Sequence, residues 1–226
     1  MKKIIFLFIL CSILLISNLS IAGNTFVTEG FEGPGYENSW SEYTDSNSYI
    51  IDDSECETYA PESGDYCLEV YSDGTGNLAK STFTLPDIVH TSEVSIRFKL
   101  SEHNLANTDV IQFANLTTNA GSKLVSLYYY YYNEVMYIAA KYLDGTRGWV
   151  YSGFYEVNEY DWNLMDFKYD ANGPGFKLKI NHKTVLKDTN LDDTWSINIR
   201  KLDIGICYNN GTGPAKLLIS SMEWDD

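Results

Sequence analysis

The chain has 226 residues, a formal net charge of −15 and 18 tyrosines. A protein this acidic repels the phosphates of nucleic acids and of anionic lipids, so we expect neither as a partner. The length fits one ordinary domain with a sizeable core, and no low-complexity linker divides it.

The N-terminus has the pattern of a secretory signal peptide. A basic start, Lys2-Lys3, precedes the apolar run Ile4 to Ile16, and small residues at Ser20 and Ala22 favour cleavage before Gly23. The apolar run is short for a membrane span. We therefore expect residues 1–22 to be removed and residues 23–226 to form a single secreted domain, extracellular or, in a Gram-negative bacterium, periplasmic. Loss of Lys2 and Lys3 takes the net charge from −15 to −17.

Three cysteines remain after this cleavage: Cys56, Cys67 and Cys207. In an oxidising compartment Cys56 and Cys67 can close a short loop, worth about 2–3 kcal/mol by the chain-entropy argument. Cys207 lies in an apolar, strand-like stretch, which predicts a buried thiol rather than a nucleophile.

Short alternating segments separated by Gly, Asn, Asp and Pro recur along the chain, and no convincing helix comes between them. This spacing predicts an all-β protein, a two-sheet antiparallel β-sandwich or jelly roll. The polar stretch from Tyr43 to Gly64 is expected to be mostly loop. The predicted strands are Phe26–Phe31, Cys67–Tyr71, Leu78–Leu85, Val94–Leu100, Val110–Ala114, Met165–Tyr169, Phe176–Ile180, Leu202–Cys207 and Lys216–Trp224.

Two N-terminal elements carry a family resemblance. Phe31-Glu32-Gly33 is followed by Trp40, and later by Ser63-Gly64-Asp65-Tyr66-Cys67-Leu68-Glu69-Val70. Together with a Tyr/Leu-rich hairpin and a C-terminal strand, this order resembles the concanavalin A-like (laminin G-like) jelly rolls. The resemblance implies two curved antiparallel sheets, lectin-like sugar or polysaccharide ligands and often a bound calcium ion. The family contains both binding modules and glycan-cleaving enzymes.

Five consecutive tyrosines, Tyr128 to Tyr132, lie in the predicted hairpin. With Asn133-Glu134 as the turn, Tyr132 pairs with Val135, Tyr130 with Tyr137, Tyr128 with Ala139 and Ser126 with Lys141. Those residues share one face, and Ser126 and Lys141 mark it as the solvent-facing one. The other face holds aliphatic neighbours and is expected to be core: Val125, Leu127, Tyr129, Tyr131, Met136, Ile138, Ala140 and Tyr142.

The solvent-facing tyrosines predict a carbohydrate-binding surface, because C–H faces of sugars pack on aromatic rings. Its predicted residues are Tyr128, Tyr130, Tyr132 and Tyr137, with Trp149 and Tyr151 as a rim. Three alternatives stay open: tyrosine as a good strand residue on a half-exposed face, a patch covered by loops, and a partner surface of a structural or adhesive extracellular protein.

Calcium is implied by the resemblance through a glutamate of the N-terminal element, which is Glu32 here, with Glu29 as a second candidate. In the last strand, where relatives carry paired acids, this chain has Ser220-Ser221, and Asp225-Asp226 follow only after Trp224. Hard cations need about six oxygen ligands, several of them carboxylates.

Catalysis is the rival to binding. Hydrolases of this fold carry a Glu-x-Asp-x-x-Glu run, because retaining chemistry needs two carboxyl groups about 5–5.5 Å apart. The sequence has no such run and no clear lyase constellation. We therefore expect no catalytic residues, and a polysaccharide hydrolase or lyase of this fold remains the alternative.

Overall fold

The computed structural model describes residues 25–29, 31, 40–45, 47–55, 66–74, 76–171, 175–191 and 198–225. The predicted signal peptide, Glu32 and Cys56 lie outside these residues, so their roles stay predictions. Cys67 and Cys207 are both buried. No helix in the described part of the chain has the length and apolar character needed to cross a membrane.

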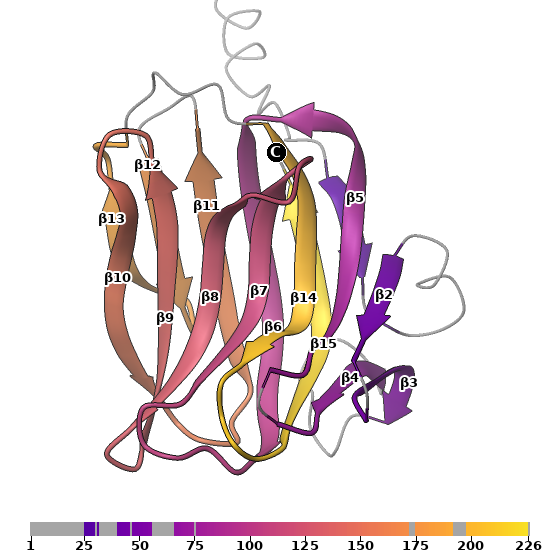
Figure 1. Ribbon diagram of the computed structural model, residues 1–226. Coiled ribbons are helices and arrows are strands. Elements are labelled where there is room, and N and C mark those ends of the chain that lie inside the picture. The colour runs from indigo at the N-terminus through magenta and orange to yellow at the C-terminus, as the bar shows by residue number, and fades with distance from the viewer. Residues whose placement is uncertain are drawn as a thin grey trace, which may run out of the picture.

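The described residues form a sandwich of two antiparallel sheets, one of eight strands and one of seven, as the sequence predicted. Figure 1 shows the seven-stranded sheet as the front layer and the other sheet behind it. The eight-stranded sheet runs in the order β13 (Lys183–Asp188), β12 (Gly175–Ile180), β11 (Asn163–Asp170), β6 (Thr91–His103), β15 (Ala215–Asp225), β4 (Tyr66–Ser72) and β3 (Tyr49–Glu55), with β1 (Thr25–Glu29) also on β15. The seven-stranded sheet runs in the order β10 (Gly148–Val157), β9 (Val135–Asp144), β8 (Lys123–Tyr132), β7 (Val110–Thr118), β14 (Ile199–Asn209), β5 (Ala79–Val89) and β2 (Trp40–Thr44).

The core lies between the sheets and is built by period-two alternation. Along β6 each second residue is buried, from Val94 through Phe98 to Leu100. Phe98 packs against Phe113 of β7 with ring centroids 4.4 Å apart, which joins the two layers. Burial of apolar side chains, at about 25 cal/mol per Å² of apolar surface removed from water, is the main stabilising contribution.

The β8–β9 hairpin has the predicted register. Tyr132 pairs with Val135, Tyr130 with Tyr137, Tyr128 with Ala139 and Ser126 with Lys141. Asn133 and Glu134 have φ of 51° and 62°, the left-handed backbone of a tight two-residue hairpin turn. Of the residues predicted to face the core, Tyr131 is partly buried against it, and the rest are buried.

The expectation that Tyr43 to Gly64 is mostly loop is wrong over its described part. The last two residues of β2 and all of β3 fall in this stretch. Both are edge strands, β2 on β5 and β3 on β4. An edge strand faces water along one side and tolerates polar residues, so its sequence lacks the apolar alternation used to recognise a strand.

An ion-pair network around the partly exposed Arg147 ties the two sheets together at one corner. Arg147, in the β9–β10 turn, donates to Asp144 at 2.8 Å and to Asp188, the last residue of β13, at 2.6 Å. Tyr142 of β9 also donates to Asp188, at 2.7 Å. Because β9 and β13 belong to different sheets, these bonds fix how the layers meet.

Candidate functional site

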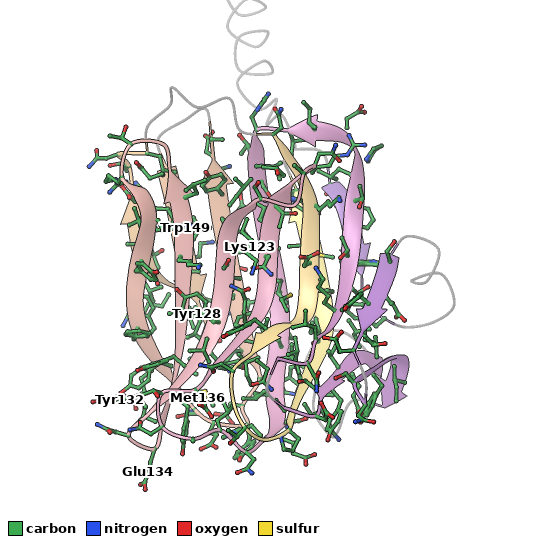
Figure 2. The ribbon with its side chains drawn as sticks, in the orientation of Figure 1. Lys123, Tyr128, Tyr132, Glu134, Met136 and Trp149 are labelled. Atoms are coloured by element: carbon green, nitrogen blue, oxygen red, sulfur yellow. The ribbon has the colours of Figure 1, made fainter. Side chains whose placement is uncertain are left out.

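The candidate site lies on the outer face of the seven-stranded sheet, the side turned away from the eight-stranded sheet. Strand pairing places Tyr151, Lys141, Ser126, Asn115, Asp203 and Thr82 in one row from β10 to β5. Paired residues point to the same side of a sheet, so this row crosses the outer face. Figure 2 shows Lys123, Tyr128 and Trp149 over this sheet, with Tyr132 and Glu134 at the hairpin turn.

A hollow of about 290 Å³ opens on this face. Its lining comes from five strands and consists of Val110, Gln112, Tyr128, Tyr130, Lys141, Tyr151, Phe154 and Tyr208. None of these eight described residues carries a carboxylate. The hollow is an open depression walled by aromatic rings, and small-molecule sites commonly combine apolar walls with a few polar groups in this way.

The rings form one continuous cluster. Tyr130 stacks on Phe154 at 4.7 Å and on Tyr132 at 6.0 Å between ring centroids. Tyr137 meets Phe154 edge-on at 6.3 Å. Tyr151 and Phe154 are the most exposed members, with 67% and 57% of their surface accessible. The predicted tyrosines are therefore held in place by their neighbours while their faces remain reachable.

Tyr128 differs from the other tyrosines of this face. It is half-buried, and its hydroxyl is buried without a hydrogen-bond partner among the described residues. Burial, and secondarily the neighbouring Tyr151, raise the pKa of this phenol well above its usual range. Tyr128 thus offers a ring wall to the hollow, and its hydroxyl stays protonated at neutral pH.

Sequence reasoning missed Phe154, because a β-bulge brings it to this face. Tyr151 pairs with Lys141 and Phe154 with Ala139, so the register shifts between them. Gly153 takes a φ of 85°, and the backbone N–H of Ala140 donates to the hydroxyl of Ser152 at 2.9 Å. A bulge turns the next side chain to the face it would otherwise avoid. Gly153 was the one residue in the sequence that indicated this bulge.

Gln112, Lys123 and Tyr208 were also missed. The ammonium of Lys123 donates to the amide oxygen of Gln112 at 2.6 Å. Tyr208 reaches the outer face because the β14–β7 register shifts between Ile204 and Tyr208, which pairs it with Gln112. These residues are far apart in the chain, and the strand order brings them together.

The remaining predicted residues lie around the hollow. Trp149 stands beside it, with the ammonium of Lys141 4.7 Å from its ring centroid. Tyr132 and Tyr137 support the ring cluster without lining the hollow. All six predicted sugar-binding residues therefore occupy one part of the sheet, and their role in binding stays a prediction.

The predicted calcium site is not tested by the described residues. Glu32 lies outside them, and Glu29 is the last residue of β1. Within the described ranges no three His, Cys, Asp or Glu side chains gather where they could hold a metal ion. Calcium binding stays a prediction.

No protein-family model matches the chain, and no curated protein matches its sequence. Several solved structures share its architecture. A cellulose-induced protein, Cip1, is 10% identical with a TM-score of 0.57, over 88% of this chain and 96% of that one. A carbohydrate esterase from the Shiga toxin-encoding bacteriophage phi24B is 14% identical with a TM-score of 0.59, over 90% and 99%. The alginate lyase AlyC3 is 12% identical with a TM-score of 0.51, over 71% and 75%. These likenesses show the fold.

Proposed function

We propose that this protein is a secreted, non-catalytic polysaccharide-binding module whose ligand lies in the hollow of the seven-stranded sheet. The observation that carries the proposal is the exposed, mutually stacked ring cluster around Tyr130 and Phe154. Sugar rings pack their C–H faces on such rings, and Gln112 and Lys141 supply polar groups beside them. The named carbohydrate esterase and alginate lyase agree with this class of ligand.

The chemistry of the hollow supports binding over cleavage. Its described lining contains no carboxylate, whereas glycoside hydrolysis ordinarily uses two. Elimination chemistry needs a group that accepts a proton, and the buried Tyr128 hydroxyl has a raised pKa, which makes it a poor one at neutral pH.

The test is affinity electrophoresis of the purified protein against a panel of polysaccharides. We expect retardation by at least one of them and its loss in the double variant Tyr130→Ala with Tyr137→Ala. Each ring contact is worth about 1 kcal/mol, so affinity should fall roughly 10–30-fold.

The matched control removes a stacked tyrosine pair from the other sheet. Tyr49 and Tyr71 stack with centroids 4.9 Å apart on the outer face of the eight-stranded sheet. Tyr49→Ala with Tyr71→Ala should leave binding unchanged. Unaltered binding by the Tyr130/Tyr137 variant, with both variants folded by circular dichroism, would reject the proposed face.

Two further outcomes separate the alternatives. Release of reducing or unsaturated sugar ends from the panel would favour a hydrolase or lyase. Concentration-dependent self-association with no response to any glycan would favour a structural or adhesive protein. The predicted export is tested separately, since the mature protein should begin at Gly23.

A further inference from the structure

The outer face of the seven-stranded sheet gathers positive charge on a chain of net charge −15. Four lysines lie on it: Lys80 on β5, Lys123 on β8, Lys141 on β9 and Lys201 on β14, where Lys201 and Lys123 both pair with Thr117. Lys80 is neutralised, since its ammonium lies 2.9 Å from the carboxylate of Asp203.

Lys123 and Lys141 have neutral partners. Lys123 donates to the amide of Gln112 at 2.6 Å, and Lys141 lies over the ring of Trp149. Neither forms an ion pair with a carboxylate of the described residues. An acidic protein has carboxylates in excess, so two lysines beside an open hollow without one leave a local positive field.

The surroundings of Lys123 disfavour its charged form. Lys123 is exposed as a whole residue, but partial burial is the main cause that lowers its pKa; Lys141 and Lys80 lower it further, while Cys207 and Asp203 act in the opposite direction. Desolvation and like-charge repulsion both oppose a cation at this position. An anionic group bound between the lysines would relieve both effects.

We propose that the ligand of this face is an anionic polysaccharide, whose acidic groups pair with Lys123 and Lys141 while its sugar rings pack on Tyr130, Tyr151 and Phe154. This inference rests on the proposed function and narrows its substrate class. Carboxylates of uronic acids and sulfate esters share the required chemistry. Charge-assisted hydrogen bonds to either are roughly twice as strong as neutral ones.

The experiment compares three polysaccharides with the purified protein: polygalacturonate, dextran sulfate and neutral xylan. Binding is measured by affinity electrophoresis at low and high salt. We expect retardation by polygalacturonate or dextran sulfate, weakened at high salt because screening acts on charge pairs. The first polymer carries only carboxylates and the second only sulfates, so the pair identifies the acidic group.

The decisive variant is Lys123→Met with Lys141→Met. Its matched control is Lys177→Met with Lys187→Met, two paired lysines on the eight-stranded sheet that make the same change in net charge. We expect the Lys123/Lys141 variant to lose at least about tenfold in affinity for the anionic polymer and the control to lose little. Lys123→Arg with Lys141→Arg should retain binding, which guards against a folding effect.

Equal losses in the two methionine variants would overturn the inference, because net charge rather than a site would then explain the binding. Binding of xylan alone, unaffected by Lys123 and Lys141, would also overturn it while leaving the proposed function standing. Absence of binding to any polysaccharide would refute the proposed function itself.

Discussion

On the outer face of the eight-stranded sheet lysines lie beside carboxylates, whereas on the seven-stranded sheet Lys123 and Lys141 have neutral partners. In the first sheet Lys168 lies 3.5 Å from Glu93, and Lys179 lies 3.8 Å from Asp166. The stacked tyrosine there is also satisfied locally, since Tyr49 donates to Glu69 at 2.9 Å.

The two faces thus use the same residue types with different partners. On the eight-stranded sheet Lys168 and Lys179 have carboxylate partners on the same face. The other presents exposed rings and two cations, Lys123 and Lys141, that form no ion pair within the described residues, which is how a surface complements an outside partner. The following predictions test this difference, from the largest expected effect to the smallest.

The largest effect on stability should come from the ion-pair network between the sheets. Asp144 is buried and accepts hydrogen bonds from the guanidinium and the backbone N–H of Arg147. We expect Asp144→Ala to cost about 2–3 kcal/mol, because it leaves Arg147 without this partner. Urea denaturation measures the loss, and a change below 0.5 kcal/mol would show that the network does not hold the sheets together.

The same network predicts acid sensitivity. Hydrogen bonds from Arg147 lower the pKa of Asp144 to about 2. Burial of Asp188 favours its neutral form, but bonds from Tyr142, Asn190 and Arg147 outweigh burial and lower its pKa too. A lowered folded-state pKa adds stability above the unfolded value, near pH 4, and that stability is lost as pH falls toward 2. Melting temperature should therefore drop over this window, and the drop should be smaller in Asp144→Asn.

Phe154 should matter for binding far more than an exposed apolar residue of the other sheet. We expect Phe154→Ala to weaken polysaccharide binding about 5–10-fold, because it removes the ring between Tyr130 and Tyr137. Ile51→Ala, on β3, is the control and should leave affinity unchanged. Equal affinities for the two variants in a calorimetric titration would place the ligand elsewhere.

The bulge that positions Phe154 can be tested through Gly153. Gly153 and Gly76 have φ of 85° and 81°, and an added Cβ would meet no atom within 4 Å at either. Alanine at either position should cost about 1 kcal/mol of backbone strain. Only Gly153→Ala should also weaken glycan binding. If both variants bind as well as the wild type, the bulge does not control the ring cluster.

The smallest effects concern surface charge. Glu93→Gln should cost less than about 0.5 kcal/mol, because exposed ion pairs contribute little. Lys123→Met with Lys141→Met should leave stability nearly unchanged, since no ion pair is lost and the desolvation of Lys123 is relieved. A clear destabilisation of the lysine variant would indicate that these lysines serve the fold.

The hairpin could be predicted because its information is local. The alternation from Val125 to Tyr132 fixes which residues share a face, and Asn133-Glu134 fixes the register. β2 and β3 could not be recognised, because edge strands carry polar residues on both faces.

The candidate site was predictable only where it came from that hairpin. Phe154 and Tyr208 reach the outer face through shifts in strand register, which simple alternation places on the wrong side. Lys123 has Gln112 as its neutral partner, whereas Lys80 has Asp203 as its ion-pair partner, and both contacts depend on the order of strands in the sheet. That order is set by packing between segments far apart in sequence.

The most direct test is to map, by NMR, which aromatic side chains respond when a binding oligosaccharide is added to the purified protein. Shifts at Tyr130, Tyr151 and Phe154, with Tyr49 and Tyr71 unmoved, are the predicted result. Binding that shifts Tyr49 and Tyr71 while the rings of the hollow stay unchanged would contradict the assignment of the seven-stranded sheet as the glycan-binding surface.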